Sequence, residues 1–306
     1  MPIKIPDALP ATSELERENI FVMTEKRALH QDIRPLRVLL LNLMPAKIST
    51  ETQILRKLSN TPLQIEVSLL QTSSHASTHT PAAHLATFYH TFDEVADQRF
   101  DGLIITGAPI ERLDFDDVDY WPEFVRISDW ASRNVHSTLH LCWGAMAGIY
   151  HRYGVGKHEL PDKLSGVYRH VVEKPTSPLV RGFDDAFWAP HSRWSGSNED
   201  QIRAHPDLEV VASSPEAGPY VVKSTDSRNF FVFGHPEYDR STLKQEYERD
   251  VKAGLNPPVP AHYFPNDDPA RPPENRWRAH GQLLYTNWLN YYVYQTTPYR
   301  VDAIGS

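Results

Sequence analysis

The first half of the chain alternates apolar, strand-like runs with segments of helical spacing. The runs at residues 36–42 and 137–139 are apolar enough for buried strands, 63–71 is a second predicted strand with partial alternation, and 101–107 is a third that ends in a turn. Helical spacing follows them at 49–58, 92–98, 120–132 and 143–151. Continuous apolar runs are typical of strands that are covered on both faces. The alternation therefore predicts an α/β fold with a doubly wound, mainly parallel sheet and helices on both of its faces.

The second half has a different pattern. Short strand-like runs at 165–172, 208–213, 220–224 and 230–234 are separated by turn residues, which predicts an antiparallel extension of the sheet. A polar helix is expected at 240–253, an irregular, proline-rich wrap at 256–275 and a terminal aromatic helix at 276–294. We divide the chain into an N-terminal arm (1–34), a single domain (35–296) and a tail (297–306).

Composition excludes several classes of protein. The net charge of −8 gives no basic surface for nucleic acid. The first residues lack the apolar core of a signal peptide, and no run reaches the length of a membrane span, so no membrane association is expected. The single cysteine excludes an internal disulfide framework and fits a reducing compartment. We therefore expect a cytoplasmic protein.

That cysteine, Cys142, falls where the fourth predicted strand meets a predicted helix. A sharp strand-to-helix turn exposes a nucleophile, and the helix N-terminus favours the thiolate. The alternative is that Cys142 is a small buried hydrophobic residue, as free cysteines commonly are.

A cysteine nucleophile needs a base and a group that orients the base. His235 follows the strand at 230–234, and Glu237 lies two residues further on, after a proline. In an extended segment, residues i and i+2 point to the same side, so the carboxylate can approach the imidazole. Because active groups lie at the carboxyl ends of parallel strands, Cys142, His235 and Glu237 are predicted to form a catalytic triad. The alternative for His235 is a surface histidine in a turn.

These segments resemble a known superfamily. Cys142-Trp143-Gly144-Ala145-Met146 and Gly234-His235-Pro236-Glu237 are similar to the nucleophile and His/Glu segments of class I glutamine amidotransferases. Nearly all of the chain resembles one branch, the homoserine O-acyltransferases of methionine biosynthesis. Its blocks occur in order as Asn42-Leu43-Met44-Pro45-Ala46-Lys47, Ile105-Thr106-Gly107-Ala108-Pro109, Leu141-Cys142-Trp143-Gly144-Ala145, Ser165-Gly166-Val167-Tyr168, Pro190-His191-Ser192-Arg193 and Gly234-His235-Pro236-Glu237-Tyr238.

The resemblance implies a class I glutamine amidotransferase-like fold, a homodimer and acyl transfer from an acyl-CoA to the hydroxyl of L-homoserine. In the implied ping-pong reaction, Cys142 takes the acyl group as a thioester and His235 then deprotonates the acceptor hydroxyl. Lys163, Ser192 and Arg249 match family positions for substrate binding. The backbone N–H of Trp143 and one from the turn at 42–47 would stabilise the oxyanion, and Lys47 would contact the donor.

The family divides between acetyl and succinyl donors. Residue 111 is glutamate here, where succinyl-using relatives have glycine. A carboxylate at the end of the pocket repels the second carboxylate of succinate and fills its space. We therefore expect acetyl-CoA as co-substrate and O-acetyl-L-homoserine as product. The alternative is that Glu111 pairs with Arg112 on the surface.

Two other patterns are rejected. His75 and His79 have a zinc-like spacing, but they lie in a Ser/Thr/Pro loop without a third ligand. Residues 154–157 resemble the end of a phosphate-binding loop, but the first glycine and the final Ser/Thr are missing. No metal and no bound cofactor are expected. The alternative functions are homoserine O-succinyltransferase, serine O-acetyltransferase, a glutamine amidotransferase-like hydrolase and a non-enzymatic stress or binding protein.

Overall fold

A computed structural model describes residues 3–5, 22–24, 34–75, 79–298 and 300–304. Its strands are β1 (Ile3–Ile5), β2 (Val22–Thr24), β3 (Leu36–Leu41), β4 (Ile65–Leu70), β5 (Tyr89–His90), β6 (Phe100–Ile105), β7 (Val135–Leu141), β8 (Lys157–Val172), β9 (Ala186–Ser197), β10 (Leu208–Ser214), β11 (Gly218–Ser224) and β12 (Asn229–Val232). Its α-helices are α3 (Lys47–Leu58), α4 (Ala82–Phe88), α5 (Phe92–Val95), α6 (Trp121–Asn134), α7 (Trp143–Tyr153), α8 (Glu199–Ala204), α9 (Thr242–Lys252) and α10 (Arg278–Asn287).

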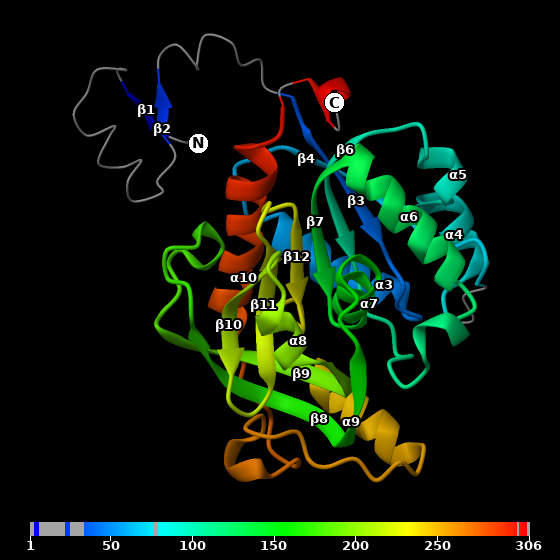
Figure 1. Ribbon diagram of the computed structural model, residues 1–306. Helices are drawn as coiled ribbons and strands as arrows, with labels where there is room; N and C mark the ends of the chain where they lie inside the picture. Colours follow the sequence, from blue (N-terminus) through cyan, green and yellow to red (C-terminus); the bar gives the residue numbers. More distant parts are fainter. Residues whose placement is uncertain (1–2, 6–21, 25–33, 76–78, 299, 305–306) are drawn as a thin grey trace.

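Ten strands form one sheet in the order β5-β4-β3-β6-β7-β12-β11-β10-β8-β9 (Figure 1). The first six in this order pair in parallel. The apolar runs predicted as buried strands form the centre of this part, and β3, β6 and β7 are almost wholly buried. The prediction of a mainly parallel sheet is confirmed. Because neighbouring strands in this part are parallel, the loops that follow β3, β6, β7 and β12 lie at the same edge of the sheet.

The other four strands are antiparallel to their neighbours. Three of them were predicted, which confirms the antiparallel extension, but β8 begins eight residues earlier than expected. Strand β9 was missed, because Pro190 and several polar side chains interrupt its apolar pattern. The long β8–β9 hairpin reaches α9, which lies beside it in Figure 1.

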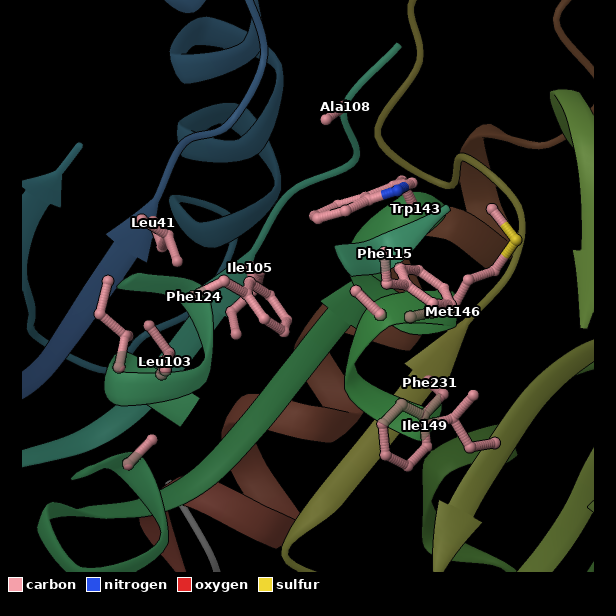
Figure 2. Packing of buried hydrophobic residues seen from close by; sticks show 14 of the residues in the cluster. Leu41, Leu103, Ile105, Ala108, Phe115, Phe124, Trp143, Met146, Ile149 and Phe231 are labelled. Carbon is pink, nitrogen blue, oxygen red and sulfur yellow. The ribbon is translucent and has the colours of Figure 1, made fainter. Parts of the chain in front are cut away.

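Helices cover both faces of the sheet, as the alternation predicted. On one face, α6 and α7 pack against β3, β6 and β12; Figure 2 shows Trp143, Met146 and Ile149 of α7 in this cluster. On the other face, α3 and α10 pack against the same strands. The terminal helix differs from the prediction in its second half, because α10 continues as a π-helix (Trp288–Tyr294). Its Trp288 indole donates a hydrogen bond to Ser137 of β7.

Two short helices were also missed. Helix α4 takes up the end of a segment expected to be loop, and α8 follows β9 with the Asn198 side chain capping its N-terminus. Most of the expected N-terminal arm lies outside the described residues, so the division into arm, domain and tail stays a prediction. In the described part of the chain, no helix is long and apolar enough to cross a bilayer.

Candidate active site

The ends of three parallel strands meet at one point. Gly107 follows β6, Cys142 follows β7 and His235 follows β12. A Cβ atom at residue 107 would lie 3.2 Å from the Cβ atom of Cys142 and 3.7 Å from the Cε1 atom of His235. Cys142 and His235 therefore face the same small space, which the missing side chain of Gly107 leaves open.

Cys142 has a strained backbone. Its φ of 48° and ψ of −112° are unusual for a residue with a side chain, and such strain concentrates at functional sites. The close approach of α7 to the end of β6 maintains this strained conformation of Cys142. A Cβ atom at residue 144 would lie 2.6 Å from the carbonyl oxygen of Thr106, so glycine is required there. The turn thus fixes Cys142 at the N-terminus of α7, where the helix dipole favours a negative charge.

His235 is held from two sides. Its Nδ1 atom lies 2.7 Å from the Glu237 carboxylate, and its ring stacks on Tyr238 with centroids 4.0 Å apart. Both His235 and Glu237 are buried. Burial lowers the pKa of His235, but the facing Cys142 and Glu237 raise it more, and the pKa is well above its ordinary value. The imidazolium is therefore favoured beside the sulfur.

These groups open into a cleft of about 890 Å³. The residues on its wall include several that were predicted from the sequence: Glu111, Cys142, Lys163, Ser192, His235 and Arg249. The carbonyl oxygen of Ser192 lies 4.0 Å from the Cys142 sulfur. Glu237 and Trp143 do not line the cleft. Glu237 lies behind His235, and the Trp143 side chain is fully buried against α6 and the 115–121 segment.

Lys163 and Arg249 converge on a carboxylate that sequence reasoning missed. The Lys163 ammonium lies 2.5 Å from one oxygen of Asp250, and the Arg249 guanidinium donates to the other oxygen at 2.7 and 2.9 Å. Burial raises the pKa of Asp250, but the hydrogen bonds from Lys163 and Arg249 lower it below its ordinary value. Lys163 is buried, whereas the Arg249 side chain is 61% exposed.

Glu111 is fixed on the wall of the cleft. Its carbonyl oxygen accepts from the Lys157 ammonium at 2.9 Å and from the Ser195 hydroxyl at 2.7 Å, and its carboxylate accepts from the Trp194 N–H at 3.3 Å. Burial raises the pKa of Glu111 above its ordinary value. The alternative pairing with Arg112 is wrong, since Arg112 pairs with Glu159 at 2.7 Å.

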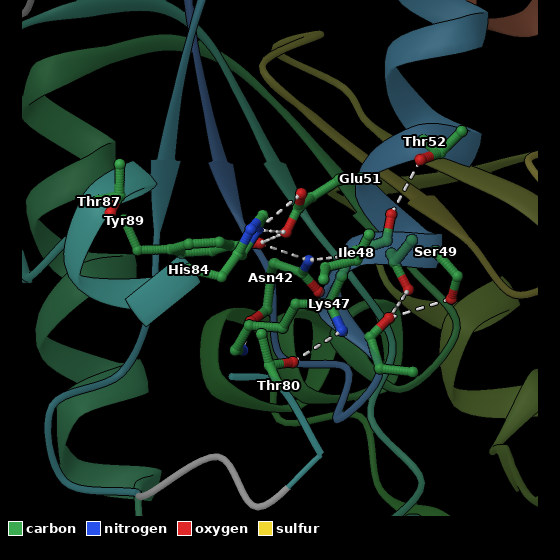
Figure 3. Close-up of polar contacts among 12 residues, drawn as sticks. Asn42, Lys47, Ile48, Ser49, Glu51, Thr52, Thr80, His84, Thr87 and Tyr89 are labelled. Carbon is green, nitrogen blue, oxygen red and sulfur yellow. Dashed lines mark hydrogen bonds and ion pairs between the residues drawn. The ribbon is translucent and has the colours of Figure 1, made fainter. Parts of the chain in front are cut away.

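Lys47 lies in a separate polar cluster (Figure 3). Its ammonium donates to the carbonyl oxygen of Asn42, and the Asn42 amide donates to Lys47 O at 3.2 Å and to the Tyr89 hydroxyl oxygen at 2.9 Å. Tyr89 donates to Glu51 at 2.5 Å, so the turn at 42–47 is tied to α3. Burial lowers the pKa of Lys47 to about 8, although Glu51 opposes the shift.

Lys47 lines a cavity of about 260 Å³ rather than the main cleft. Met44, Pro45, Ala108, Pro109, Ile110 and Leu113 line both spaces, so the two adjoin. The turn at 42–47 thus forms part of the wall between them.

The two histidines rejected as metal ligands have different surroundings. His75 pairs with Asp119 at 2.7 Å, and His79 lines the cleft. Among the residues that the structure describes, no group of three or more His, Cys, Asp or Glu side chains is placed to hold a metal ion.

Three further residues at the site escaped sequence reasoning: Tyr238, Glu246 and Asp250. Glu246, Arg249 and Asp250 stand at i, i+3 and i+4 of α9, which is the spacing of one helix face. That spacing was visible in the sequence, but a charged helix face is usually solvated. The contact of this helix face with β8 makes the face part of the site, and the sequence did not reveal that contact.

Comparison with known proteins places the chain in a family. The family model described as homoserine O-succinyltransferase matches residues 2–299. The chain belongs to this family. Two relatives named homoserine O-acetyltransferase are those of Acetivibrio thermocellus, 54% identical, and Brevibacillus brevis, 57% identical; the matches cover 99% of this chain and 100% and 99% of theirs. A relative named homoserine O-succinyltransferase, from Tolumonas auensis, is also 57% identical over 99% of this chain and 96% of its own length.

A solved structure supports the fold. A glutamine amidotransferase from Thermotoga maritima aligns with a TM-score of 0.56 at 11% identity, covering 84% of this chain and 97% of that one. The expected class I glutamine amidotransferase-like fold is thereby confirmed.

Proposed function

We propose that this member of the family transfers an acetyl group from acetyl-CoA to the hydroxyl of L-homoserine, giving O-acetyl-L-homoserine for methionine biosynthesis. The observation that carries the proposal is the arrangement at the strand ends: a strained Cys142 faces His235, which Glu237 orients at 2.7 Å. The names of the acetyltransferase relatives, at 54% and 57% identity over the whole chain, agree with it.

The reaction runs in two halves. The Cys142 thiolate attacks the thioester carbon of acetyl-CoA, the CoA thiolate leaves and takes a proton from His235, and the acetyl group stays on sulfur. His235, now neutral, takes the proton of the homoserine hydroxyl as that oxygen attacks the acetyl-enzyme. The Cys142 thiolate leaves, and O-acetyl-L-homoserine departs. Glu237 holds the proton on Nδ1, so that Nε2 is the atom that gives a proton in the first half and takes one in the second.

Each tetrahedral intermediate carries an oxyanion. The N–H of Trp143, the first residue of α7, has no acceptor within the helix and lies next to the sulfur in the chain. We assign it as one donor, with a second from the turn at 42–47, which Lys47 and Asn42 stiffen.

Glu111 supports acetyl-CoA as the donor. Identity does not decide between donors, because an acetyltransferase and a succinyltransferase are each 57% identical to this chain. Glu111 lines the cleft and is held in place through its carbonyl oxygen. A second carboxylate on the acyl group would meet this side chain in a poorly solvated space, which is unfavourable.

Ser192, Lys163 and Arg249 are proposed to bind the acceptor. Ser192 lies beside the sulfur, and the exposed part of Arg249 is free to reach the acceptor carboxylate. No bound cofactor or metal has a part in these steps. A reduced thiol as nucleophile suits the cytoplasm, and a homodimer is proposed from the family alone.

A steady-state assay tests the function. The purified protein is given acetyl-CoA or succinyl-CoA with L-homoserine or L-serine, and CoA release is followed. We expect turnover to be fastest with acetyl-CoA and L-homoserine. Faster turnover with succinyl-CoA or L-serine would support the alternative transferases. Glutamine hydrolysis at a comparable rate would instead support a hydrolase.

A further inference from the structure

A buried arginine of β9 lacks an acidic partner. Arg193 is 5% exposed. Its guanidinium donates to two carbonyl oxygens, that of Ala217 at 2.6 Å and that of Ser195 at 3.3 Å. Its Nε atom is buried and has no hydrogen-bond partner in the described part of the chain. A guanidinium stays protonated in proteins, so the chain holds a buried and incompletely bonded positive charge here, which is costly.

This arginine borders a cavity that is separate from the cleft. The cavity measures about 190 Å³, which is several times the roughly 30 Å³ that one water molecule occupies in the liquid. None of the described residues lines both spaces. Strand β9 supplies Ser192 and Trp194 to the cleft, whereas it supplies Arg193, Gly196 and Ser197 to the cavity. A ligand in the cavity would therefore leave the cleft open.

The cavity reaches the guanidinium itself. Gly196 lies on the cavity wall, and a Cβ atom there would be 3.8 Å from the Nη1 atom of Arg193 and 3.3 Å from the Cε1 atom of His158. The missing side chain of Gly196 thus leaves open space beside Nη1. The hydroxyl of Ser197, on the same wall, is buried and has no partner among the described residues. A charged and a neutral donor are therefore unused at this cavity.

The remaining wall limits which ligand fits. Its apolar residues are Leu160, Leu164, Ile202, Ala217, Pro219 and Phe233. Two partly exposed carboxylates at the cavity have partners of their own, since Glu199 pairs with Arg203 at 2.7 Å and Glu216 pairs with His262 at 3.3 Å. These carboxylates would repel a second negative charge on a ligand. The wall therefore suits a single carboxylate on a short apolar chain.

We propose that this cavity is a binding site for a short aliphatic monocarboxylate, whose carboxylate accepts hydrogen bonds from Arg193 and Ser197 while its chain packs on the apolar wall. A water molecule would satisfy an N–H group of Arg193 but would leave its charge unneutralised, whereas a carboxylate does both. The inference does not depend on the proposed function, because no residue of the cleft takes part in it.

Titration calorimetry on the wild-type protein tests the chemistry of the ligand. The probes are 4-methylpentanoate and 4-methylpentan-1-ol, which has the same chain without the charge. We expect 4-methylpentanoate to bind one site per chain with a Kd of about 1 mM or tighter, and the alcohol to bind at least about 10-fold more weakly, because hydrogen bonds between charged groups are the strongest. Equal binding of the two probes, or no binding of the acid by the wild type at about 10 mM, would overturn the proposal.

A third probe distinguishes two sources of such a carboxylate. L-leucine has the carbon skeleton of 4-methylpentanoate with an α-ammonium added. Tighter binding of L-leucine than of the acid would identify an amino acid, whose ammonium Glu199 or Glu216 would accept. Weaker binding of L-leucine would identify an acid without an amine.

Variants locate the bound probe. Gly196→Val fills the space beside Arg193, and Gly156→Val is the matched control, because it adds the same side chain at a residue that does not line the cavity. Ser197→Ala removes a hydroxyl that bonds to no described residue, so it should fold like the wild type by circular dichroism. We expect the affinity for 4-methylpentanoate to fall at least about 10-fold in Gly196→Val and about 3- to 10-fold in Ser197→Ala, and to be unchanged in Gly156→Val.

Arg193→Met removes the charge and should weaken binding of the acid at least about 10-fold while leaving binding of the alcohol unchanged. Wild-type affinity for the acid in Gly196→Val, Ser197→Ala or Arg193→Met would place the ligand elsewhere and overturn the proposal.

Discussion

The ring of Tyr238 stacks on the ring of His235, with centroids 4.0 Å apart and planes inclined by 18°. Glu237 holds the Nδ1 atom of the same imidazole, so its position is fixed by one face and one edge. The Nε2 edge is left for proton exchange at Cys142. The proposed base is thus held in position by neighbouring side chains of the chain itself, and acid–base catalysis requires such positioning.

Replacing Glu237 should slow both halves of the reaction. In Glu237→Gln the amide can donate to Nδ1, which favours the wrong tautomer of His235. We expect the rates of Cys142 acetylation and of its deacylation by L-homoserine each to fall about 10²- to 10⁴-fold. Rapid-quench measurement of each half, with circular dichroism as a check on folding, decides the matter. A loss below fivefold in both would mean that Glu237 does not orient the base.

Glu111→Gly should change donor preference. Without the carboxylate, the cleft accepts the second carboxylate of succinate, and we expect the ratio of kcat/KM for succinyl-CoA to that for acetyl-CoA to rise about 100-fold. The control is Glu159→Gln, which removes the exposed carboxylate paired with Arg112. If acetyl-CoA stays strongly preferred in Glu111→Gly, donor choice lies elsewhere.

The buried Lys47 should make stability depend on pH. Its pKa is about 8 in the folded protein against 10.5 ordinarily, so below pH 8 folding must keep a charge in a poorly solvated place. Between pH 8 and 10.5 the unfolded chain binds more protons, and stability therefore rises with pH at this group. Relative to Lys47→Met, the free energy of unfolding of the wild type should increase across this window by up to about 3 kcal/mol.

Urea unfolding of both proteins at pH 7, 8 and 9.5 measures that difference. A difference that stays constant, or that falls as the pH rises, would show that Lys47 keeps an ordinary affinity for its proton.

Gly144→Ala should loosen the turn between β7 and α7 that contains Cys142. The added Cβ atom would lie 2.6 Å from the Thr106 carbonyl oxygen, so α7 must move away from β6. We expect a loss of about 1–3 kcal/mol in stability together with slower acetylation of Cys142. Gly156→Ala is the matched control, because its Cβ atom would meet its nearest neighbour, the Gln201 oxygen, at 3.7 Å. Equal thermal stability of the two variants would contradict the account of the turn.

Local patterns were enough to predict the parallel half of the fold. The apolar run at 36–42 predicts a buried strand, because a strand covered on both faces carries few polar residues. Strand β9 lacks that signal, since Pro190 and Arg193 lie within it and its pairing with β8 is a long-range property. The π-helix at the end of α10 likewise has no signal in the helical spacing, and its Trp288, Leu289 and Val293 pack in the cluster on one face of the sheet.

In the candidate site too, local patterns predicted some residues, and others depend on long-range packing. Cys142, His235 and Glu237 could be singled out because strand ends and short spacings are visible in the chain. The Glu246–Tyr238 and Lys163–Asp250 contacts could not, since each depends on where α9 docks. The surface pairing of Glu111 with Arg112 was wrong because it considered only neighbours in the sequence. Arg112 instead pairs with Glu159, which is 47 residues away in sequence.

The most direct test of the account is whether Cys142 carries the acyl group. The protein is mixed with acetyl-CoA in the absence of acceptor, and its intact mass and tryptic peptides are measured by mass spectrometry. The account predicts one added acetyl group, on the peptide that contains Cys142, absent in Cys142→Ala and lost when L-homoserine is added. Acetyl transfer to L-homoserine that persists in Cys142→Ala, or an acetyl group found on another residue, would contradict it.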